Sequence, residues 1–112
     1  MHFCLTGQNT PQALKSLIEN PSVGRYEAVK KTVETAGGKL IAMYGMPAEG
    51  PGVMVIFDMP EPGAGAAAVA GVPIANGVLH HVKLTRLLTV EEVAHVRQVA
   101  NKVNAGYAPP GH

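Results

Sequence analysis

The chain has 112 residues, of which 46% are hydrophobic, and this predicts a single globular domain with a core of its own. Its formal net charge of +1 gives no field that would attract nucleic acid or an anionic membrane surface. One cysteine allows no internal disulfide, and no signal peptide or membrane-spanning run is evident, so we expect a cytoplasmic protein. Only 15% of the residues are charged, against about 25% in ordinary soluble domains, which favours burial of surface in a homo-oligomer.

Hydrophobic periodicity divides the chain into strands and helices. Phe3 and Leu5 alternate with polar residues as in a half-buried strand. Thr10 favours a helix start, and Thr89 with Glu92 forms a capping box before another helix. We expect strands over residues 2–6, 39–46, 53–59 and 78–88, helices over residues 11–19, 24–36, 63–72 and 90–103, and turns over residues 47–52 and 73–77.

This order is β-α-β-β-α-β followed by a C-terminal helix, and it predicts an α+β fold of the ferredoxin-like split βαβ type with a four-stranded antiparallel sheet. We expect one domain over residues 1–103 and a flexible tail over residues 104–112, where glycine and proline are frequent. Helices cover only one face of such a sheet. The other face is not polar enough to be simply solvated, so we expect a second copy to cover it.

Four segments, in the same order, resemble the GYD-domain family of small bacterial proteins. They are residues 11–21 (PQALKSLIENP), 36–40 (AGGKL), 53–57 (VMVIF) and 82–92 (VKLTRLLTVEE). The resemblance spans residues 3–103 and implies a fold of the dimeric α+β-barrel type, in which two sheets face each other. It implies no activity, because the family has none that is well established. The Gly-Tyr-Asp motif falls by position on residues 49–52, whose sequence Glu-Gly-Pro-Gly lacks the tyrosine and the aspartate.

Alternation places several reactive side chains on the face away from the helices. In the ferredoxin-like order the first strand pairs with the fourth, so we expect Cys4 near Lys83 and on the same face as His81, unless a bulge reverses the alternation. A thiol near a lysine is a candidate nucleophile. Tyr44, near the barrel mouth, is a candidate hydrogen-bond donor. The candidate ligand-binding residues are therefore Cys4, Tyr44, His81 and Lys83.

A metal site is not favoured. With Cys4 near Lys83, His2 and His81 lie four strand positions apart, roughly 13 Å at about 3.3 Å per residue, which is too far to hold one ion. We therefore expect no metal and no cofactor. The same alternation puts Arg86 on the helix side of the sheet, where we expect it to pair with Glu91 or Glu92.

The leading functional hypothesis is a homo-oligomeric α+β-barrel protein that binds a small molecule between its sheets. The alternative is a small dimeric-barrel enzyme, such as a cofactor-free isomerase, a monooxygenase-like protein or a haem-handling protein, which would use the same four residues. A pure assembly module, with its faces packed together and no cavity, is the second alternative.

Overall fold

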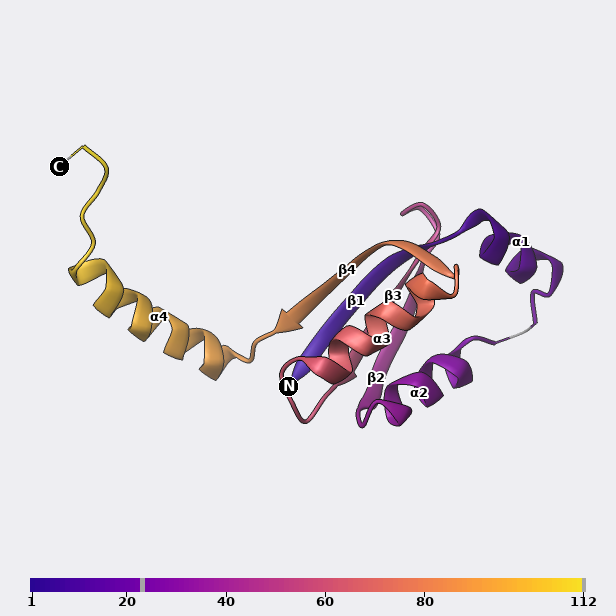
Figure 1. The fold of residues 1–112 in the computed structure, drawn as a ribbon, viewed down its shortest axis with the longest axis horizontal. Coiled ribbons are helices and arrows are strands. Elements are labelled where there is room, and N and C mark those ends of the chain that lie inside the picture. The colour runs from indigo at the N-terminus through magenta and orange to yellow at the C-terminus, as the bar shows by residue number, and fades with distance from the viewer. Residues whose placement is uncertain (23, 112) are drawn as a thin grey trace.

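The computed structural model describes residues 1–22 and 24–111 (Figure 1). The strands are β1 (His2–Asn9), β2 (Lys39–Met46), β3 (Gly52–Asp58) and β4 (Leu79–Leu87). The helices are α1 (Pro11–Glu19), α2 (Tyr26–Thr35), α3 (Ala64–Ala75) and α4 (Val90–Ala105). Each strand and helix predicted from the sequence is present.

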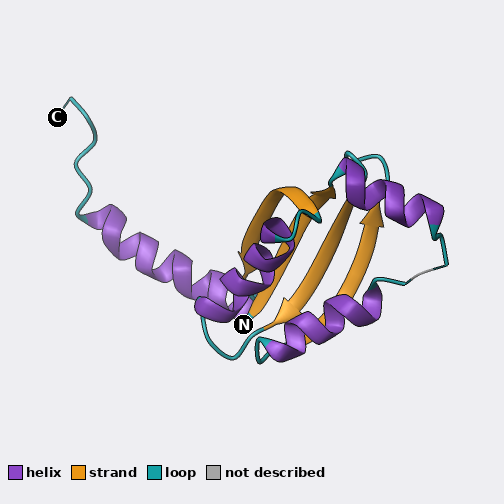
Figure 2. Ribbon diagram, turned by 45° about the vertical axis from the view of Figure 1, so that its right-hand side comes forward, coloured by secondary structure: helices purple, strands orange, loops and turns teal. Residues whose placement is uncertain are grey.

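The strands form one antiparallel sheet in the order β2-β3-β1-β4. This confirms the predicted α+β fold with its four-stranded sheet and ferredoxin-like strand order. Helices α2 and α3 lie across one face, and α1 lies beyond the end of β1 (Figures 1 and 2). No helix of the described residues lies across the opposite face, which we call the open face.

The core lies between the sheet and the two helices α2 and α3. Phe3 and Leu5 point inward as predicted, and Phe3 stacks on Phe57 with the ring centroids 5.8 Å apart. Val33 of α2 and Val69 of α3 are buried against them. Burying a side chain of this size contributes about 1.5–3 kcal/mol, so this layer supplies most of the stability of the domain.

Helix α3 is built mostly of small side chains, which let it lie close to the sheet. Ala66 and Ala70 are buried. At Gly65 a Cβ atom would meet the Met59 side chain and would lie 3.1 Å from the Ala36 carbonyl oxygen. The small residues therefore set the distance between α3 and the sheet.

The predicted turn over residues 73–77 is wrong at its start, because α3 continues through Pro73 to Ala75. Proline in a helix removes one backbone hydrogen bond and crowds the preceding turn. Because Pro73 is in the last turn of α3, the missing hydrogen bond destabilises the end of the helix and not its interior. The carbonyl oxygen of Pro73 also accepts a hydrogen bond from the Val78 backbone N–H at 2.9 Å, which ties the helix end to the start of β4.

Both predicted helix starts form. The Ala13 backbone N–H donates to Thr10 Oγ1 at 3.2 Å, which caps α1. At α4, the Glu92 backbone N–H donates to Thr89 Oγ1 at 3.1 Å, and the Thr89 backbone N–H donates to Glu92 Oε1 at 3.1 Å. Arg86 Nη2 donates to Glu92 Oε2 at 3.0 Å, so one of the two predicted pairings of Arg86 is confirmed.

Helix α4 leaves the rest of the molecule and projects away from the sheet (Figures 1 and 2). The radius of gyration is 18.0 Å, whereas a compact chain of this length has about 13 Å. Within the described residues, the Arg86–Glu92 contact is the one side-chain hydrogen bond between α4 and the sheet. The helix ends at Ala105, two residues inside the predicted tail. We call residues 1–88 the body.

Candidate functional site

The register of the sheet fixes which side chains lie on the open face, because directly paired residues of antiparallel strands point to the same side. Two central rows cross the face from β2 to β4. These rows are Tyr44, Met54, Thr6 and Lys83, and Ala42, Ile56, Cys4 and Thr85. Three of the predicted candidates, Cys4, Tyr44 and Lys83, therefore share the open face.

The three residues lie apart on this face. Tyr44 and Lys83 are on the two edge strands, about 14 Å apart at roughly 4.8 Å per strand spacing. The expected position of Cys4 beside Lys83 is wrong by two residues. Cys4 pairs with Thr85, and Lys83 pairs with Thr6. Cys4 and Lys83 are thus diagonal neighbours on adjacent strands, with their backbones about 7–8 Å apart. The arrangement lines a surface and does not place the ammonium directly opposite the thiol.

His81 does not occupy the open-face position that alternation predicts. The ladder pairs Gln8 with His80 and leaves His81 as an extra residue opposite Gly7, with a positive φ of 52°. This is a β-bulge, and it puts His80 in the expected place of His81. The sequence held one signal for it. Glycine inside a strand often marks a bulge, and a Cβ atom at Gly7 would lie 3.2 Å from Val82 Cγ2.

One end of the open face carries an ion pair. The N-terminal ammonium of Met1 donates to Asp58 Oδ1 at 2.8 Å. This hydrogen bond, more than any other contact, lowers the pKa of the Asp58 carboxyl below its ordinary value. Among residues 1–22 and 24–111, no three His, Cys, Asp or Glu side chains gather as metal ligands.

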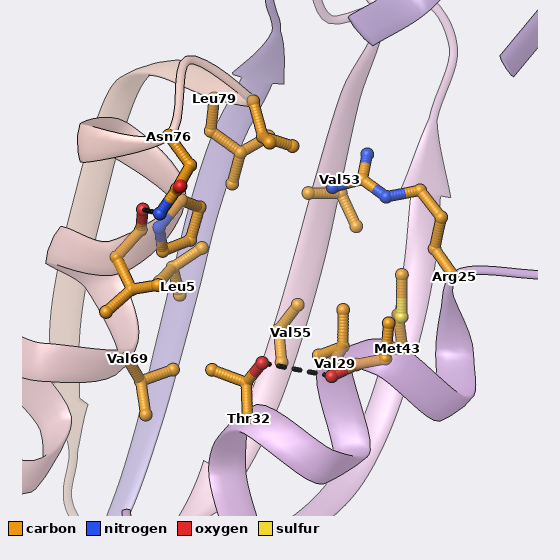
Figure 3. A pocket seen from close by; sticks show the side chains of 14 residues that line it. Leu5, Arg25, Val29, Thr32, Met43, Val53, Val55, Val69, Asn76 and Leu79 are labelled. Carbon is orange, nitrogen blue, oxygen red and sulfur yellow. Dashed lines mark hydrogen bonds between the residues drawn. The ribbon is translucent and has the colours of Figure 1, made fainter. Parts of the chain in front are cut away.

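A pocket of about 260 Å³ lies on the helix-covered side of the sheet (Figure 3). Leu5, Val53 and Val55 are its floor, α2 and α3 are its walls, and Met43 and Leu79 also line it. Its lining is mostly aliphatic. The sequence does not predict this pocket, because a space between two helices follows from their packing and leaves no local sequence pattern.

Arg25 is the one charged residue that lines this pocket, and its side chain extends over the pocket toward Val53 (Figure 3). Its Nη1 donates to Asn9 Oδ1 at 2.8 Å, and Asn9 Nδ2 donates to the Pro51 carbonyl oxygen at 3.2 Å. Partial burial lowers the pKa of the Arg25 guanidinium, which still stays protonated at neutral pH. In the described part of the chain, no carboxylate forms an ion pair with it.

Helix α4 carries an apolar stripe with no partner among the described residues. Val96 is 51% exposed, Val103 is 65% exposed and Tyr107, just past the helix, is 60% exposed. They line a shallow hollow with their neighbours Val99, Ala100 and Asn104. Spacings of three, four and seven residues put these side chains on one side of the helix.

No protein-family model matches this chain, and no curated protein matches it. The resemblance to the GYD-domain family therefore stays a prediction from the four sequence segments. Within the described residues, no helix combines the length and the apolar character needed to cross a membrane.

Proposed function

We propose that this chain is a homo-oligomeric α+β protein whose copies associate through the open face and the α4 stripe and enclose a small molecule between their sheets. Excess surface carries the proposal. The chain exposes 7619 Å², whereas a folded monomer of 11.7 kDa exposes about 5,900 Å². The excess of about 1,700 Å² per copy lies within the range of about 1,000–2,500 Å² that each partner of an obligate dimer buries.

A second copy is the partner that fits both surfaces. The open face presents Met54 and Ile56 at its centre, and α4 presents an apolar stripe at the other end of the molecule. In a symmetric dimer each contact occurs twice, so the α4 stripe of each copy can pack on the open face of the other. Most of the stability of a helix in a protein comes from packing of its apolar face, and no residue of α4 is buried in the single chain, which favours a partner for α4.

The polar side chains of Lys83 and Tyr44 on the open face support the proposal of a bound small molecule. Covering this face removes water from the Lys83 ammonium and the Tyr44 hydroxyl, and a buried polar group without a partner costs about 1–3 kcal/mol or more. A molecule with acceptor groups between the sheets restores those hydrogen bonds. Lys83 and Tyr44 lie at opposite edges, which leaves the less polar centre of the face for the body of the ligand.

Sedimentation equilibrium of two matched double variants tests the association. Val96→Lys with Val103→Lys puts two charges into the α4 stripe, and Gln98→Lys with Asn101→Lys puts the same charges on the opposite side of the helix. We expect the wild type and the second variant to sediment as multiples of the 11.7 kDa chain and the first variant as a monomer. A wild type that stays monomeric at its highest soluble concentration contradicts the proposal, as does an unchanged mass in the stripe variant.

Native mass spectrometry of protein purified from cells tests the enclosed molecule. We expect an assembly heavier than its chains, with the extra mass lost in Lys83→Met. An assembly with the mass of the chains alone, together with a dry space between the sheets in a crystal structure, would leave association standing and remove the ligand.

A further inference from the structure

We propose that the pocket between α2 and α3 binds a small monocarboxylic acid, with its carboxylate on Arg25 and its apolar body against the sheet. This site lies on the helix side of the sheet, away from the open face, and does not depend on self-association. It is formed within one copy of the chain.

The shape and lining of the pocket select an apolar ligand of limited size. Its volume of about 260 Å³ is slightly below the range of about 300–1,000 Å³ that is usual for pockets that bind drug-sized ligands. Val29, Val55 and Val69 surround it, and their methyl groups hold ordered water poorly. An alkyl chain or a small ring displaces that water with a gain of about 25 cal/mol per Å² of apolar surface buried.

The charge at the pocket selects the head group. Arg25 is partly buried and is held by a neutral amide, Asn9, so its positive charge has no anionic partner in the described part of the chain. Guanidinium carries five N–H donors in a planar fork that fits a carboxylate with two parallel hydrogen bonds. The other polar residues lining the pocket, Thr32 and Asn76, are neutral. One positive charge balances a monoanion, and a phosphate dianion would remain half neutralised.

The hydrogen bonds around Arg25 give it a fixed position. Asn9 donates to the Pro51 carbonyl oxygen through both its backbone N–H, at 3.0 Å, and its Nδ2, at 3.2 Å. This orients the Asn9 side chain so that Oδ1 faces Arg25 Nη1. A guanidinium that is already oriented loses less conformational entropy when a carboxylate binds, which raises the affinity for the carboxylate.

A titration with hexanoate and with hexan-1-ol tests the site, because the two probes share an alkyl chain and differ in charge. Methyl NMR of the full chain gives both the affinity and the location. We expect hexanoate to shift the methyl signals of Val29, Val55 and Val69, with an affinity at least about tenfold above that of hexan-1-ol. Arg25→Gln removes this preference and leaves the binding of hexan-1-ol unchanged.

Two further variants complete the test. Val72 lines the pocket and is 50% exposed, so Val72→Phe fills the space without disturbing the core, and we expect it to block both probes. Lys31→Gln removes one positive charge from α2 outside the pocket lining and should bind hexanoate as the wild type does. Three results each overturn the proposal: no binding of hexanoate, equal affinity in a folded Arg25→Gln variant, or shifts confined to open-face residues such as Met54.

Discussion

The body and α4 both carry apolar side chains, but these side chains are buried in the body and exposed in α4. In the body, Phe57, Met59 and Val33 are 0% exposed. In α4 no residue is buried, and Val103 remains 65% exposed. The comparison shows that an apolar stripe predicts which side of a helix is buried, but does not predict the surface against which it packs.

Local interactions hold the junction between the two regions. The capping box at Thr89 and the ion pair from Arg86 to Glu92 fix the first turn of α4 and its link to β4. These interactions involve residues close in sequence, so they form whether or not a partner is present. The direction in which α4 leaves the body is therefore set at its start.

The largest expected difference between the regions comes from truncating one apolar side chain in each, buried in the body and exposed in α4. Phe57→Ala deletes a ring that is 0% exposed and stacked on Phe3, and we expect a loss of about 3–5 kcal/mol in the free energy of unfolding. Val103→Ala changes that free energy by less than about 0.5 kcal/mol at concentrations where the chain is a monomer. Urea unfolding at several protein concentrations measures both. A similar loss in the two variants in dilute protein would show that α4 packs on its own body.

A smaller effect separates two glycines within the body. At Gly38 a Cβ atom would meet Met59 Sδ and the Asp58 backbone oxygen, so Gly38→Ala should lower the free energy of unfolding by about 1–3 kcal/mol. Gly71 of α3 has no atom within 4 Å of such a Cβ, and Gly71→Ala should raise it by about 0.5–1 kcal/mol through helix propensity. Thermal unfolding gives the two signs, and the same sign in both would contradict the packing described at Gly38.

The smallest effect concerns the pH dependence of the α4 start. The hydrogen bond from the Thr89 backbone N–H, with further help from Arg86, lowers the pKa of the Glu92 carboxyl. A lowered folded pKa means that the stabilisation is complete above the ordinary value of 4.5 and is lost as the pH falls through the folded value. We expect the first turn of α4 to fray there, seen in the NMR shift of the Thr89 amide.

Two substitutions in the same turn serve as controls for that titration. Glu92→Gln keeps a side-chain acceptor that does not titrate, so the shift of the Thr89 amide should lose its dependence on pH. Glu91→Gln removes a neighbouring carboxylate outside the capping box and should leave the titration unchanged. A midpoint at or above 4.5 in the wild type would contradict the lowered pKa.

Much of the fold was predictable from the sequence because its signals are local. Thr10 and Thr89 predicted two helix starts, because their side chains cap the following turn. The alternation of Phe3 and Leu5 with polar residues predicted the first strand. The strand order followed from the order of the elements. Pro73 misled the prediction, because a proline in the last turn of a helix is tolerated where the following residues satisfy the helix end.

The candidate site was predictable only in part. Alternation alone placed Cys4 and Lys83 on the open face, because a two-residue period survives in regular strands. It failed at His81, because a bulge is decided by how closely Gly7 lets β4 approach β1. The pocket and the role of Arg25 had no sequence signal, since they arise where α2, α3 and the turn at Pro51 meet.

The sequence by itself determined the helices, the strands and the low charge that points to buried surface. The tertiary structure decided the register, the pocket and the departure of α4 from the body. The physical reason is range. Propensity, capping and periodicity act over a few residues, whereas register, cavities and the burial of an apolar stripe depend on contacts between segments far apart in the chain or between copies of it.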